Sequence, residues 1–247
     1  MDTNNPAPSC SHCLARQHCL SARLEGEALH NYEQMVCFLN VPRQTRLVTR
    51  GAPLTQLYSV RQGQFKTETR APGGASQVTG WYLPGQMLGL DALADGHYVS
   101  DAIALCDSAV CAIPYQALAT AMTADPALMG QFHHLLGEEL VRRHSAMLLL
   151  GSARAPQRMA SFLLELASQQ AKGQEMGQRG QRALRLCMPR EDISSYLGLA
   201  VESVSRLLSR FRAEGLITVS NRAISLLDVP RLQQLAVPAE DDQPEAA

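Results

Sequence analysis

The sequence has no segment that would place the chain in a membrane or export it from the cell. No run approaches the roughly 18 apolar residues of a membrane-spanning helix. Residues 1–9 are polar and contain proline, unlike the basic and then apolar start of a signal peptide. The chain also has little net charge, −1 over 247 residues, and no internal repeat. We therefore expect a cytoplasmic protein, and any nucleic-acid surface on it must be a local basic patch.

The length and the cysteine content narrow the class further. A chain of 247 residues with 46% hydrophobic residues can form two domains with packed cores and an element that connects them. Its seven cysteines are an odd number, and a reducing cytoplasm disfavours disulfides. Clustered cysteines in such a chain suggest metal binding or redox chemistry.

The first domain is expected to be an antiparallel β-roll. Between about residues 41 and 114, short β-type runs are separated by glycine and proline, which is typical of a roll or jelly roll. The expected strands are 45–49, 57–60, 64–69, 77–82, 102–105 and 109–113.

A long helix is expected after Pro126. Its apolar residues recur in alternating steps of three and four, the spacing of a coiled-coil seam. The alternative is a helix packed on its own roll, because buried amphipathic helices share this spacing. A long seam after a complete roll favours a partner helix and therefore a homodimer. The apolar seam residues are Met129, Phe132, Leu136, Leu140, Met147 and Leu150.

The C-terminal part has the pattern of a winged helix-turn-helix. Residues 190–197 begin with acidic side chains that complement a helix dipole, 198–200 form a tight turn around a glycine, and 201–211 form a second helix. The segments 216–219 and 223–226 predict a hairpin, the wing. With the roll, this gives an α+β chain.

The second helix has the two faces that a DNA-reading helix needs. Its apolar residues, expected to be buried, are Val204, Leu207, Leu208 and Phe211. On the other face, Glu202, Ser205 and Arg206 suit base edges in the major groove, while Arg210 and Arg212 suit phosphates. The alternative is an ordinary surface helix with a solvated charged face, which the turn glycine and the wing make less favourable.

Three cysteines lie close together near the start, in the spacing Cys10-x2-Cys13-x5-Cys19. Thiolates so spaced suit an iron–sulfur cluster or a tetrahedral zinc ion, and both prefer a fourth ligand. His12 or His18 could complete a zinc site. The segment alone does not choose between them.

From about Cys10 to Leu235 the chain resembles the fumarate and nitrate reduction regulator family of the cyclic-AMP receptor protein superfamily. The resemblance rests on the cysteine loop and on residues 80–85 (GWYLPG), 110–114 (VCAIP), 148–150 (LLL) and 196–199 (YLGL), in matching order and spacing. It implies a cluster-binding segment at 1–24, a β-roll sensor at 25–125, a dimerisation helix at 126–152 and a DNA-binding domain at 153–238. The acidic tail 239–247 is expected to be disordered.

The resemblance further implies a [4Fe–4S] cluster held by Cys10, Cys13, Cys19 and, just before the Ile-Pro motif, Cys111. Cys106 is nearby, but it lies outside the motif, and strand alternation would point it differently from Cys111. The remaining two cysteines, Cys37 and Cys187, are expected to be small buried residues.

Several positions depart from what the resemblance implies. Residues 90–100 lack the arginine that binds a cyclic phosphate, so cyclic AMP is not an expected ligand. RNA polymerase is an implied partner, although residues 71–76 lack the family's acidic contact residues. His12, Leu14 and His18 differ around the ligands and could alter oxygen sensitivity. Arg143 replaces an acidic seam residue, and like charges across a seam would keep the cluster-free chain monomeric.

The sequence thus predicts an oxygen-responsive transcription regulator, not an enzyme. With its cluster intact, the dimer would bind palindromic sites with TTGAT-type arms and activate or repress promoters. One alternative is a regulator of the same superfamily with a structural zinc or a small ligand in the roll. Another is a redox iron–sulfur protein, which the winged helix argues against.

Overall fold

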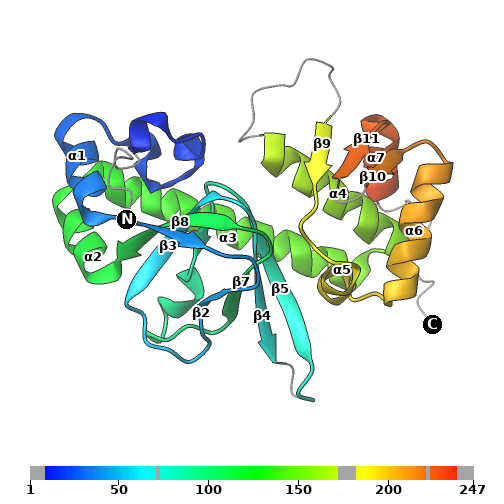
Figure 1. Ribbon diagram of the computed structural model, residues 1–247, viewed down its shortest axis with the longest axis horizontal. Coiled ribbons are helices and arrows are strands. Elements are labelled where there is room, and N and C mark those ends of the chain that lie inside the picture. The colour runs from blue at the N-terminus through cyan, green and yellow to red at the C-terminus, as the bar shows by residue number, and fades with distance from the viewer. Residues whose placement is uncertain (1–8, 71–72, 172–181, 221–222, 238–247) are drawn as a thin grey trace, which may run out of the picture. The chain divides into compact units, whose positions relative to one another are not determined.

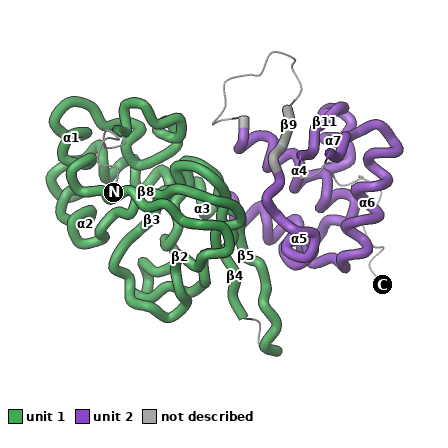
Figure 2. The backbone as a smooth tube through the Cα atoms, in the orientation of Figure 1, with its two compact units in different colours: residues 1–141 green, residues 142–247 purple. Residues whose placement is uncertain are grey.

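The computed structural model describes residues 9–70, 73–171, 182–220 and 223–237 (Figure 1). The chain divides into two compact units, residues 1–141 and 142–247 (Figure 2). The boundary between the units falls inside the long helix expected at residues 126–152. The division of the chain into five segments, including a separate dimerisation helix, stays a prediction. Within the described ranges, no helix has both the length and the apolar character needed to cross a membrane.

Unit 1 contains the β-roll that the sequence predicts. Two antiparallel four-stranded sheets have the strand orders β1-β8-β3-β6 and β2-β7-β4-β5. Their apolar inner faces enclose a core that includes Val60, Phe65, Leu88 and Val110. The strands are β1 (Cys37–Val41), β2 (Arg46–Val48), β3 (Gln56–Gln62), β4 (Phe65–Arg70), β5 (Ser76–Tyr82), β6 (Met87–Leu88), β7 (Asp101–Ala104) and β8 (Ser108–Pro114).

Helices precede, interrupt and follow the roll. The sequence does not predict β1, because this edge strand is mostly exposed and lacks an alternating apolar pattern. The helices of this part are the 3-10 turns η1 (Cys10–His12), η2 (Arg16–His18), η3 (Leu20–Arg23) and η4 (Leu90–Ala92), with α1 (Gly26–Met35), α2 (Tyr115–Ala124) and α3 (Pro126–Ser152).

The two halves of α3 have different surroundings. Phe132 was expected in a dimer seam, but it is only 6% exposed and lies in the core of unit 1, with Met129 and Leu136 packed against the same cluster. The first half therefore follows the alternative interpretation, a helix packed on its own roll. Beyond it, the exposed apolar residues of the helix are Leu140, Val141, Met147, Leu148 and Leu150.

Unit 2 is a winged helix-turn-helix, as predicted. The wing is the hairpin β10–β11, which belongs to a three-stranded sheet with the order β10-β11-β9. Phe162, Leu163 and Phe211 are fully buried in this unit. The wing turn, 221–222, and the tail 239–247 lie outside the described residues. The elements are α4 (Ala155–Ala171), β9 (Arg182–Arg185), α5 (Arg190–Leu197), α6 (Val201–Ala213), β10 (Ile217–Ser220), β11 (Ala223–Leu226) and α7 (Val229–Ala236).

Candidate cysteine site and DNA-binding surface

The three N-terminal cysteines lie on a loop of consecutive 3-10 turns. The amide of Cys13 donates to the carbonyl of Cys10 at 3.1 Å, and the amide of Cys19 donates to that of Arg16 at 3.2 Å. Glu33 ties the start of this loop to α1, because its Oε1 accepts from the Cys10 amide at 2.7 Å. The loop is thus tied to α1 within unit 1.

Cys111 approaches this loop from the roll. It lies on β8, the strand between β1 and β3, where its cross-strand neighbours are Phe38 and Ser59. One pocket brings it together with the three loop cysteines. The pocket is lined by Cys10, Cys13, Ala15, Cys19, Ser21, Tyr32, Ser59, Val60, Arg61 and Cys111.

The other cysteines do not line this pocket. Cys106 is partly exposed, and its Sγ lies 3.9 Å from Ser108 Oγ. Cys187 is buried, as predicted. The prediction that Cys37 is buried is wrong: it is exposed, because it begins the edge strand β1. His12 and His18 do not line the pocket either.

Burial and mutual repulsion disfavour thiolates in the pocket. Burial, reinforced by the charges of Cys10, Cys13 and Cys19, raises the pKa of Cys111 to about 12, while Arg61 opposes the shift. Burial also raises the pKa of Cys10 and of Cys19, and hydrogen bonding by Ser21 lowers both. Cys10, Cys19 and Cys111 therefore hold their protons at neutral pH, and a bound cation would displace these protons. Within the described part of the chain, no three His, Cys, Asp or Glu side chains are grouped closely enough to hold one metal ion.

A buried glutamine connects the cysteine loop with α3. Gln131 is 3% exposed, and its Nε2 donates to the carbonyl of Cys19 at 3.1 Å. Sequence reasoning missed this residue. Its signal is a polar side chain at helical spacing between Leu128 and Leu135, which are both buried. The contact joins the loop to the helix that carries the exposed apolar residues.

In unit 2, α6 is held with its polar face outward. Gly198 ends α5 in the left-handed conformation, with φ of 61°, which favours glycine. As predicted, the buried side of α6 consists of Val204, Leu207, Leu208 and Phe211. Its exposed side carries Glu202, Ser205, Arg206, Arg210 and Arg212.

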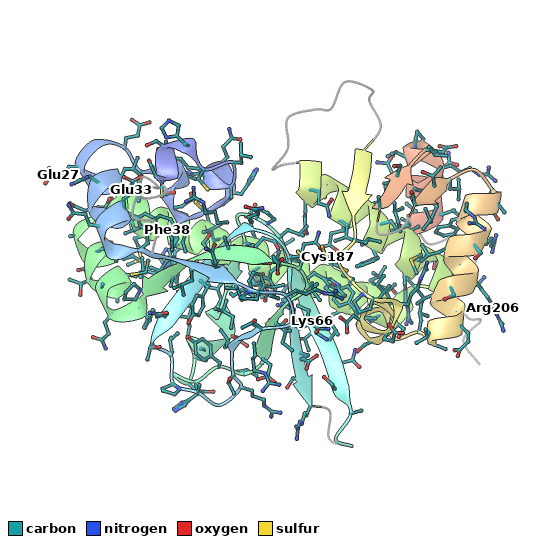
Figure 3. The ribbon with its side chains drawn as sticks, in the orientation of Figure 1. Glu27, Glu33, Phe38, Lys66, Cys187 and Arg206 are labelled. Atoms are coloured by element: carbon teal, nitrogen blue, oxygen red, sulfur yellow. The ribbon has the colours of Figure 1, made fainter. Side chains whose placement is uncertain are left out.

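The exposed arginines of α6 differ in their surroundings. Arg206 projects from the outer side of the helix (Figure 3). Arg210 pairs with Glu214 one turn further on, with Nε 2.6 Å from Oε1. The roles of Arg206 in reading base edges and of Arg210 in contacting phosphates stay predictions.

Arg143 has partners within its own unit. Arg143 is partly buried. Burial raises the pKa of Glu165 on α4, and the positive charges of Arg142 and Arg143 partly offset this rise. Burial also raises the pKa of Tyr196 on α5 to about 12, although the charges of both arginines lower it. The proposed repulsion by Arg143 across a dimer seam stays a prediction.

Replacing Arg206 by alanine should weaken operator binding by about 1–3 kcal/mol and relax discrimination at one base pair, because a base contact is lost. Arg212→Ala should weaken binding to all sequences alike, since a phosphate contact carries no sequence information. Titrations of labelled operator and of single-base variants would measure both. Unchanged discrimination by Arg206→Ala would remove Arg206 from base reading.

A β-roll followed by a winged helix-turn-helix defines a class of DNA-binding transcription regulators. Residues 38–125 match the model of the cyclic nucleotide-binding domain, and residues 157–235 match that of the Crp-like helix-turn-helix domain. The structure of FixK2 from Bradyrhizobium japonicum is similar, with a TM-score of 0.73 and 28% identity over 83% of this chain and 98% of the other.

Within that class, two curated relatives cover almost the whole chain. The transcriptional regulatory protein btr of Bordetella pertussis is 37% identical over 230 residues, 93% of each chain. The fumarate and nitrate reduction regulatory protein of Escherichia coli is 34% identical over 230 residues, 92% of this chain and 90% of the relative. The chain therefore belongs to the fumarate and nitrate reduction regulator family, whose members here are named as regulators rather than enzymes.

Proposed function

We propose that this regulator senses oxygen through a [4Fe–4S] cluster held by Cys10, Cys13, Cys19 and Cys111. The observation that carries the proposal is the single pocket that these cysteines share, although Cys111 belongs to a strand far along the chain from the other three. The family supports the same cofactor.

The residues around the pocket fit such a group. Four thiolates are the donor set of a [4Fe–4S] cluster. A cluster bound by four thiolates is an anion, and the pocket holds a buried cationic atom, Arg61 Nη1, without a hydrogen-bond partner among the described residues. When bound, the cluster would supply the oxygen-sensitive redox chemistry.

The contacts of the loop suggest how its state could reach α3. Glu33 ties Cys10 to α1, and Gln131 ties Cys19 to α3. A group bonded to the loop and to Cys111 together would hold both contacts, and its loss would release the loop and alter the support of α3. The exposed row from Leu140 to Leu150 would then pair less well with a second copy.

The dimer would bind TTGAT-type palindromes, because two winged helices related by a two-fold axis read two half-sites. RNA polymerase would be the partner at target promoters. Control by cyclic AMP is not proposed: Asp91 lies in the segment where the cyclic phosphate would need an arginine, and its Oδ2 accepts from Ser100 Oγ at 2.6 Å. An acidic group there would repel a phosphate.

Metal and sulfide analysis of protein purified without oxygen tests the cofactor. We expect about four iron and four sulfide per chain and visible absorbance that air bleaches. One zinc per chain without sulfide would instead support a regulator with a structural metal. Protein without metal that binds DNA equally in air and under nitrogen would support a ligand-responsive regulator.

A further inference from the structure

The pocket contains an arginine whose charge the fold leaves uncompensated. Arg61 Nη1 is buried and has no hydrogen-bond partner within the part of the chain that the structure describes. The guanidinium carbon lies 5.1 Å from the centre of the Phe38 ring, a cation–π contact that holds the side chain but neutralises no charge. A buried cationic donor without a partner is costly, and such groups ordinarily bind an anion.

The backbone directs Arg61 into this position. The register between β3 and β8 shifts between Val60 and Gln62, so Arg61 is the extra residue of an irregularity in the ladder. Such bulges re-aim a side chain and are common beside functional sites. Here the re-aimed side chain lines the pocket together with Cys111, and its charge opposes the high pKa of that thiol.

The other thiols have a different polar neighbour. Ser21 is fully buried, its Oγ lies 3.1 Å from Cys19 Sγ, and its hydroxyl also lowers the pKa of Cys10. The neutral hydroxyl of Ser21 thus acts on Cys10 and Cys19, while the positive charge of Arg61 acts on Cys111. Ser21 and Arg61 therefore stabilise the thiolate forms of different cysteines.

We propose that Arg61 sets the reduction potential of the bound cluster. This inference rests on the proposed function. Four thiolates and a [4Fe–4S]²⁺ core carry a net charge of about −2, and reduction adds one electron, taken from a reductant. A fixed positive charge beside the sulfurs stabilises the more negative state, so it raises the midpoint potential. By the same physics it hinders loss of an electron to dioxygen.

The test is a dye-mediated reductive titration with dithionite under nitrogen, followed by the cluster's absorbance. Arg61→Gln removes the charge and should shift the midpoint potential to more negative values and shorten the cluster's lifetime in air. Arg61→Lys keeps a charge and should stay near the wild-type potential. The matched control is Arg50→Gln, which removes an exposed arginine that does not line the pocket and should change nothing.

Iron and sulfide contents accompany each titration. Arg61→Gln with a full cluster and the wild-type potential would overturn the inference and leave the proposed function intact. Wild-type protein without iron and sulfide would instead overturn the proposed function itself. If Arg61→Gln binds no cluster, Arg61→Lys decides: a full cluster at the wild-type potential supports the role of charge, and loss of the cluster from both variants contradicts it.

Discussion

Replacing Cys111 by serine should abolish the cluster and the anaerobic binding of operator DNA together. Cys111 is the only one of the four pocket cysteines that the roll supplies. Without it, no bond links the loop to β8, and the loop gains no ordering free energy from a bound group. Iron, sulfide and operator affinity would be measured on protein prepared without oxygen.

The chain offers matched controls for this substitution. Cys106→Ser changes a cysteine five residues away that does not line the pocket, and Cys37→Ser changes an exposed one. Both variants, and Cys187→Ser in unit 2, should retain the cluster and DNA binding. A full cluster in Cys111→Ser, or its loss from Cys106→Ser, would show that the fourth ligand has been assigned to the wrong residue.

Replacing Arg158 by methionine should destabilise unit 2 by about 3 kcal/mol. Its guanidinium donates to the carbonyls of Leu150 and Ala153 at 2.8 Å and of Leu197 at 3.0 Å. These carbonyls lie at or just beyond the C-terminal ends of α3 and α5, where a positive charge is favourable. Three such bonds at roughly 1.5 kcal/mol each would give more, but the side chain is partly exposed.

Calorimetry of the full chain would measure the loss in the unfolding transition of unit 2. Arg231→Met is the control, because Arg231 is exposed on α7 and its hydrogen bond to Asp228 is donated by the backbone amide, which the substitution keeps. Operator affinity should also fall for Arg158→Met, since Leu197 directly precedes the turn into α6. Equal stability of the two variants would contradict the role given to the three bonds.

The amphipathic pattern of α6 is sufficient to predict which face of the helix is buried and which is exposed. Four apolar residues at helical spacing had to face a core, so the exposed face followed directly. The same pattern was ambiguous for α3. Phe132 fits both a dimer seam and a helix packed on its own roll, and only the structure shows that it lies in the core of unit 1.

The surroundings of the cysteines were less predictable than the cysteines themselves. The spacing of Cys10, Cys13 and Cys19 indicates a shared site, but Arg61 and Gln131 reach it through contacts distant in sequence. No local pattern encodes the register shift that re-aims an arginine. The exposure of Cys37 was also missed, because a short edge strand leaves little periodicity to detect.

The most direct test of the account is sedimentation and operator binding of one wild-type preparation, first under nitrogen with its cluster intact and then after exposure to air. The account predicts a dimer that binds a TTGAT-armed palindrome tightly, and then, as iron is lost, a monomer with much weaker binding. An air-exposed protein that has lost its iron yet remains dimeric and binds the same site equally well would contradict it.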